Sequence, residues 1–157
     1  QVKLRAGEAT AAWALMDRVV AFASPTGQWP EAIHPLTGGG CMGDGQHIWA
    51  AAEWLMFVRN LFVREEGDLL VIGAGVWSEL WRSPGDLSFG PTLTPHGTVT
   101  VRFALQPGGL RVQLDGTWRS PGAPRREVRV PGCPPGCLAA GDATAEILLP
   151  LSRLTSA

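Results

Sequence analysis

The sequence has no tyrosine, little charge and only three cysteines among its 157 residues. Charged residues make up 17% of the chain and the formal net charge is −1, so there is no basic excess to attract nucleic acids or anionic membrane surfaces. No run of about 20 apolar residues, the length a membrane-spanning helix needs, occurs in the sequence. We therefore expect neither nucleic acid nor a membrane as a partner.

The cysteines do not form a recognisable framework. Cys133 and Cys137 stand in CPPGC, but no second pair completes a zinc site, and an odd number of cysteines argues against a disulfide scaffold. The first ten residues, QVKLRAGEAT, do not resemble a signal peptide. We predict no metal and no cofactor, and the free thiols favour a reducing, cytoplasmic location.

Hydrophobic periodicity divides the chain into a helical half and a strand half. Apolar residues recur at steps of three and four in residues 7–24 and again in residues 46–64, which predicts two long helices. Residues 25–46 form a long connection, and loops of this length are usually functional or disordered. We predict a helical hairpin with a functional loop over residues 1–66 and an antiparallel β unit over residues 67–157.

In the second half the hydrophobic period changes to two. TVTVRFAL and LRVQL alternate on either side of a QPGG turn, the pattern of a β-hairpin. Further short strands are expected at residues 68–72, 127–130 and 145–149. The predicted fold class is α+β, with two long helices followed by an antiparallel, β-sandwich-like unit.

The second predicted helix is apolar on nearly every face. Between Ile48 and Val58 the one charged residue is Glu53. A helix that is apolar all round is normally buried all round, so this one requires more neighbours than the chain supplies and Glu53 requires a partner. We expect Trp49 to lie in the core, and self-association through this helix where its neighbours are missing.

The long loop carries a spaced motif in the stretch GQWPEAIHPLTG. Its defining residues are Gly27, Pro30, Glu31, Pro35, Thr37 and Gly38. This motif resembles a segment near the C-terminus of the glucoamylase-like six-hairpin glycoside hydrolases, which fold as (α/α)6 barrels. Ala32 stands where those enzymes often have glutamine.

The resemblance implies that the chain is the C-terminal part of such a hydrolase, with its two helices at the end of the α/α barrel. It also implies that Glu31 is the general base that activates water. Inverting hydrolysis uses two carboxyl groups roughly 6.5–9.5 Å apart. The family's general acid comes from an earlier helix connection that has no counterpart here. We therefore expect a fragment that acts on a glucosidic or related linkage only together with an upstream barrel.

Four further residues of the loop are candidates for substrate binding: Trp29, His34, Asp44 and His47. A tryptophan beside a catalytic carboxylate suits a sugar subsite, although packing is an equal alternative for an aromatic side chain. Asp44 precedes the second helix, and its most economical role is the N-cap of that helix, with a hydrogen-bond acceptor for a sugar hydroxyl as the alternative. The two histidines are suited to hydrogen bonds with sugar hydroxyls or to structural roles.

A different class of function remains open from the sequence. The chain is alternatively a stand-alone, non-catalytic domain that binds a carbohydrate or another protein. Trp29, Trp77, Trp81 and Trp118 are then the candidates for a ring-stacking surface.

Overall fold

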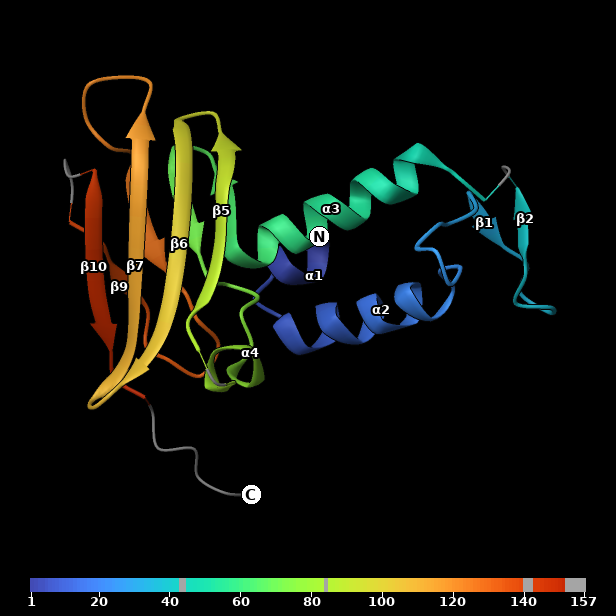
Figure 1. The fold of residues 1–157 in the computed structure, drawn as a ribbon, viewed down its shortest axis with the longest axis horizontal. Coiled ribbons are helices and arrows are strands. Elements are labelled where there is room, and N and C mark those ends of the chain that lie inside the picture. The colour runs from blue at the N-terminus through green and yellow to red at the C-terminus, as the bar shows by residue number, and fades with distance from the viewer. Residues whose placement is uncertain (43–44, 84, 140–142, 152–157) are drawn as a thin grey trace. The chain divides into compact units, whose positions relative to one another are not determined.

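The computed structural model describes residues 1–42, 45–83, 85–139 and 143–151. The chain divides into two compact units, Gln1–Val58 and Arg59–Ala157. Helix α3 (Ile48–Phe62) runs through the boundary between them (Figure 1).

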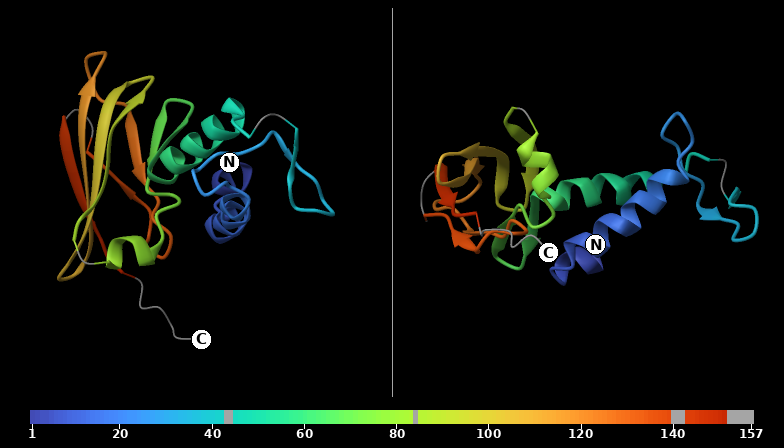
Figure 2. Two further views of the ribbon diagram at one scale, coloured as in Figure 1. Left: turned by 45° about the vertical axis from the view of Figure 1, so that its right-hand side comes forward. Right: turned by 90° about the horizontal axis from the view of Figure 1, so that it is seen from below.

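The first unit consists of helices and one short hairpin. Its elements are α1 (Val2–Arg5), α2 (Ala9–Ala21), β1 (Ala32–Ile33), β2 (Gly40–Met42) and most of α3. Trp13 on α2 packs edge-on against Phe57 on α3, with 6.1 Å between the ring centroids. The β1–β2 hairpin lies beyond the C-terminal end of α2 and the N-terminal end of α3 (Figure 2).

Helix α2 forms where the apolar spacing predicts a helix, but it ends earlier than expected. The buried side chains are Ala9, Ala12 and Met16, spaced by three and four residues. The helix stops at Ala21 because Pro25 disfavours the helical conformation of the residue before it and offers no amide hydrogen to continue the ladder.

The expectation that α3 is buried on every face is wrong. Ile48 is 83% exposed, Trp49 71% and Leu55 67%, so Trp49 does not lie in the core. Glu53 is also exposed and needs no buried partner. Within the first unit α3 packs against α2, and one neighbouring helix covers one face only.

The second unit contains two four-stranded sheets. The first is antiparallel throughout and has the strand order β10-β7-β6-β5. Its strands are β5 (Leu87–Thr94), β6 (Gly97–Gln106), β7 (Gly109–Trp118) and β10 (Thr144–Leu149). The β6–β7 hairpin closes at the predicted turn, and buried residues alternate along β6 because successive side chains face opposite sides of the sheet.

The second sheet has the order β3-β4-β8-β9 and is mixed. Its strands are β3 (Val63–Glu66), β4 (Leu69–Ile72), β8 (Arg125–Val128) and β9 (Gly136–Cys137), and the short helix α4 (Ser78–Arg82) follows β4 in the chain. β4 pairs with β8 in parallel, whereas the other pairs are antiparallel.

The two sheets of the second unit lie face to face (Figure 2). Phe103 on β6 is fully buried and lies 6.2 Å, centroid to centroid, from Phe62 at the end of α3. On the other sheet, Gly136 on β9 lies directly against Ile147 and Leu149 of β10. Each sheet therefore covers the apolar face of the other.

The predicted arrangement of two long helices followed by a single antiparallel β-sandwich-like unit is wrong. The described residues form four helices, of which only α2 (13 residues) and α3 (15 residues) exceed five residues, and three sheets. The helical pattern was extended through Val63 and Arg64, but these residues pair with β4 across the Gly67 turn. The chain is of the α+β class, but it does not form the expected end of an α/α barrel.

Four alternating charges bind β3 to the segment that follows β8. Arg64 donates to Glu66 at 2.7 Å, Arg129 donates to Glu66 at 2.9 Å, and Arg129 also donates to Glu127 at 2.8 Å. Burial raises the pKa of Glu66, but the hydrogen bonds from Arg64 and Arg129 outweigh it, so this pKa is lowered overall. The pKa of Glu127 is lowered first by its hydrogen bond from Arg129.

Because these pKa values are lowered in the folded state, the second unit should lose stability as the pH falls. A carboxylate with a lowered folded-state pKa contributes stability above its unfolded pKa, here about 4.5, and loses it as the pH falls through the folded value. The unfolding free energy of the unmodified protein should fall between pH 7 and pH 3, and in Arg129→Met this fall should be smaller by about 1 kcal/mol, because the ion pairs to Glu66 and Glu127 are already gone. The effect is small because these side chains are partly exposed. Urea unfolding at both pH values measures it.

The matched control is Arg111→Met, which removes the same charge from β7 at a residue that has no carboxylate partner among the residues the structure describes. If the unfolding free energy falls by the same amount between pH 7 and pH 3 in Arg129→Met and in Arg111→Met, the ion pairs of Arg129 do not contribute to the pH dependence of stability.

Candidate active site

The candidate site is the hairpin that carries Glu31, and three backbone hydrogen bonds close it. The Glu31 amide donates to the Met42 carbonyl at 2.9 Å, and the His34 amide donates to the Gly39 carbonyl at 2.8 Å. At the base, the His47 amide donates to the Trp29 carbonyl at 3.0 Å. This last bond brings the start of α3 back to the residue that lies two before Glu31.

Glu31 and His47 face each other at the base of the hairpin. Oε2 of Glu31 lies 4.0 Å from Nε2 of His47, and the side chains are 49% and 29% exposed. This separation is too long for a direct hydrogen bond. A water about 2.8 Å from each atom spans such a gap with an angle near a right angle at its oxygen. The pair is therefore suited to holding a water molecule.

Trp29 anchors the hairpin to the two helices. Its indole N–H donates to the Val19 carbonyl on α2 at 3.0 Å. Its ring lies 5.6 Å from that of Trp54 on α3, at an interplanar angle of 34°. With its polar atom and one ring face engaged, Trp29 acts here as a positioning residue for Glu31 more than as an open stacking surface.

Pro30 adds stiffness directly before Glu31. A Cβ atom at Gly40 of the opposite strand would lie 2.8 Å from the Pro30 ring, so β2 passes against this ring as only glycine permits. Proline also fixes its own φ angle. Glu31 is therefore held by its neighbours on both sides of the hairpin.

The other two predicted substrate-binding residues have different outcomes. Nδ1 of His34 accepts hydrogen bonds from the amides of Leu36 and Thr37, at 3.2 and 3.3 Å, so it organises the turn of the hairpin. An accepting Nδ1 places the proton of the neutral ring on Nε2. Asp44 lies outside the described residues.

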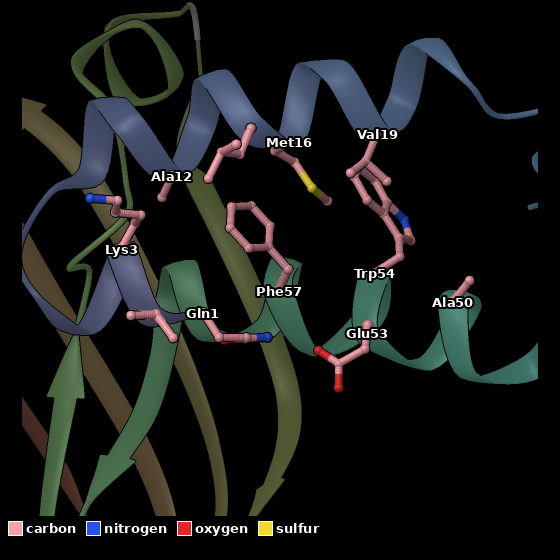
Figure 3. Close-up of a pocket in the computed structure, with 11 residues that line it drawn as sticks. Gln1, Lys3, Ala12, Met16, Val19, Ala50, Glu53, Trp54 and Phe57 are labelled. Atoms are coloured by element: carbon pink, nitrogen blue, oxygen red, sulfur yellow. The ribbon is translucent and has the colours of Figure 1, made fainter. Parts of the chain in front are cut away.

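An apolar groove lies between α2 and α3 (Figure 3). Its volume is about 420 Å³, and Met16, Trp54 and Phe57 line it. Glu53 is at its rim, whereas Glu31 and His47 do not line it. Because a sugar presents many hydroxyl groups, this groove suits apolar side chains better than a carbohydrate.

A more polar cavity of about 520 Å³ lies against the hairpin. Phe22, Ser24, Gln28 and Pro30 line it together with the glycines of the turn. It reaches Pro30 but not the carboxylate of Glu31.

The proposed tryptophan stacking surface is not formed by all of its members. Trp81 is 3% exposed, and Arg82 lies over its ring at 5.1 Å from the centroid, so this ring is closed to a ligand. Two other contributors to the site escaped sequence analysis, Trp54 and the Val19 carbonyl. Both act through contacts with Trp29 that no local pattern indicates.

The chemical inventory of the described residues holds no group of three or more His, Cys, Asp and Glu side chains placed to bind a metal ion. Burial raises the pKa of the Cys133 thiol, which disfavours the thiolate that metals and electrophiles require. Among the helices that the structure describes, none has the length and apolar character to cross a membrane.

Comparison with known proteins finds no relative of the chain: no family model, no curated protein and no solved structure matches it.

Proposed function

We propose that this chain is part of a glycoside hydrolase related to the glucoamylase-like enzymes, in which Glu31 is the general base. The observation that carries the proposal is the 4.0 Å gap between Glu31 and His47 on a hairpin anchored by Trp29. The motif GQWPEAIHPLTG supports it from the sequence. A half-exposed carboxylate on a stiff support is what water activation requires.

In this proposal the water lies between the two side chains. Glu31 takes a proton from it while the water oxygen bonds to the anomeric carbon of the sugar. The bond from that carbon to the leaving oxygen breaks, and the leaving oxygen receives a proton from a second carboxylic acid. Glu31 is the one carboxylate among residues 22–42 and 45–52, so this acid comes from elsewhere in the enzyme.

The exposed apolar side chains of the first unit support the same proposal. Leu15 and Val19 on α2, and Ile48 and Leu55 on α3, are each between 46% and 83% exposed. Surfaces of this kind are normally covered in the functional protein. We propose that other parts of the same enzyme cover them, and that the chain self-associates when those parts are absent. Sedimentation velocity on the isolated chain tests the second point, since a monomer at all concentrations contradicts it.

The proposal is tested with the complete gene product that carries this chain. We expect it to hydrolyse oligosaccharides or aryl glycosides of glucose or a related sugar, with the first-formed product inverted at the anomeric carbon, as followed by NMR. The isolated chain should have no such activity. Hydrolysis by the isolated chain would show that no second carboxylate is needed from outside it.

His47 provides a separate prediction. We expect His47→Ala to lower kcat about tenfold with little change in KM, because one hydrogen bond to the attacking water is lost, worth roughly 1–1.5 kcal/mol. His47→Gln places a donor near the position of Nε2 and should recover most of the rate. Equal losses in two variants that keep the melting temperature of the unmodified protein would show that a donor near the position of Nε2 does not hold the attacking water.

A stand-alone binding domain is the second candidate function, and one observation favours it. Trp49 exposes 71% of its surface on the first turn of α3, where a flat apolar ring is available to a sugar face or a partner protein. Calorimetric titration of the chain with oligosaccharides distinguishes the two. Binding by the chain together with a hydrolytically inactive gene product would favour this alternative.

A further inference from the structure

The second unit has a basic cavity that the proposed hydrolase reaction does not use. Its volume is about 390 Å³. Three connections form it, together with Arg125 at the start of β8: the turn at Asp68 between β3 and β4, the turn at His96 between β5 and β6, and residues 119–124 between β7 and β8. Figure 1 shows these connections at the end of the unit where β5 and β7 finish and β8 begins.

Two arginines in this cavity have unused donors. The side chains of Arg119 and Arg125 are exposed and line it together with Ser120. Among the described residues neither guanidinium has a hydrogen-bond or ion-pair partner, although Arg125 acts at longer range on the pKa of Glu127. Arg64 and Arg129 in the same unit are bound to carboxylates. Some arginines of the unit therefore form ion pairs with carboxylates, whereas Arg119 and Arg125 face solvent in the same cavity.

The backbone around the cavity is fixed in advance of any ligand. The Arg119 amide donates to the His96 carbonyl at 2.9 Å. The His96 amide donates to Oγ1 of Thr94 at 3.1 Å, and this buried hydroxyl donates to the Gly97 carbonyl at 2.8 Å. His96 forms part of the wall, but its Nε2 is shielded from solvent, so the guanidiniums and Ser120 are the donors that a ligand meets.

The charges of the cavity select the kind of anion. Arg119 and Arg125 against Asp68 leave a formal charge of +1. A singly charged carboxylate balances this charge, whereas a doubly charged phosphate does not. The planar fork of a guanidinium matches a carboxylate or a phosphate with two parallel hydrogen bonds, so the net charge and Asp68 decide between these anions. Asp68 repels anions but accepts hydrogen bonds from hydroxyl groups.

We propose that this cavity binds a small hydroxylated monocarboxylate, such as a sugar acid. Arg119 and Arg125 hold its carboxylate, and Asp68 accepts its hydroxyl groups. The site lies in the second unit and does not depend on Glu31, so it stands whether or not the chain belongs to a hydrolase.

Calorimetric titration of the complete gene product with sodium glucuronate tests the proposal. We expect a dissociation constant at or below about 1 mM, and much weaker binding of glucose and of inorganic phosphate. Arg119→Gln and Arg125→Gln should each weaken glucuronate binding by about tenfold or more. Arg111→Gln, which removes the same charge from the other end of β7, should leave it unchanged.

A further variant tests the charge argument. Asp68→Asn should strengthen the binding of phosphate, because it removes the repelling carboxylate. Circular dichroism of each variant checks its fold. Three results would overturn the proposal: glucose binding as tightly as glucuronate, phosphate binding more tightly than glucuronate to the unmodified protein, or folded Arg119 and Arg125 variants with unchanged affinity.

Discussion

Glu31→Gln is expected to lower kcat of the complete gene product by about 10²–10⁴-fold, the contribution of a general base. Glutamine keeps the volume of the side chain and the hairpin that holds it, but it has no basic oxygen to take a proton from water. KM should change little, because the carboxylate acts on water and not on the bound sugar. Initial rates over a range of substrate concentrations measure both constants.

The matched control for this variant is Glu146→Gln, the same change at an exposed carboxylate on β10. It should retain the unmodified rate. The melting temperatures of both variants should agree with that of the unmodified protein. A folded Glu31→Gln protein with a near-normal rate would remove Glu31 from the mechanism.

Gly73→Ala is expected to destabilise the second unit by about 2–5 kcal/mol. Gly73 has a φ of +77°, which costs an L-residue about 1–2 kcal/mol. A Cβ atom there would also lie 2.8 Å from Val130 and 3.0 Å from Phe103, and overpacking of a core adds about 1–3 kcal/mol. Urea unfolding monitored by the signal of the β sheets measures the loss.

Gly67→Ala separates the two contributions. Gly67 has a φ of +64°, but a Cβ atom there would meet nothing within 4 Å. It should therefore cost only the conformational part, about 1–2 kcal/mol. Equal losses at the two glycines would show that the contact between Gly73 and Phe103 is not tight.

Local patterns predict the elements that depend on local spacing. The helical repeat places α2 and α3 within the expected segments, and the strand alternation with its glycine-rich turn places the β6–β7 hairpin. The ends of these elements are less predictable. Val63 and Arg64 continue the helical repeat of α3, yet pairing with β4 makes them part of a strand.

Longer-range features of the fold had no signal in the sequence. The parallel pairing of β4 with β8 joins Leu69 to Arg125 across most of the unit. Which distant strands pair depends on the path of the chain that connects them, and the hydrophobic periodicity of a strand does not predict this path. Burial is similarly non-local: the apolar character of α3 suggested a buried helix, but the number of neighbouring helices decides exposure.

The candidate site was predicted in part. The local motif around Glu31 identifies the carboxylate and its proline, since these depend on residues adjacent in the chain. The approach of His47 to Glu31 depends on the hydrogen bond from the His47 amide to the Trp29 carbonyl, which closes the loop. The anchoring of Trp29 by Val19 and Trp54 likewise comes from two separate helices.

The most direct test of the account is the rate of Glu31→Ala in the complete gene product, with and without sodium azide. Azide attacks the anomeric carbon without needing a base, so it should restore turnover of an aryl glycoside and yield a glycosyl azide of inverted configuration. A general acid or a purely structural residue would not give this product. The nucleophile of a retaining enzyme would give it, so the hydrolysis product of the unmodified protein must also be inverted at the anomeric carbon for Glu31 to be the general base. If azide leaves the rate unchanged and no glycosyl azide forms, Glu31 is not the general base.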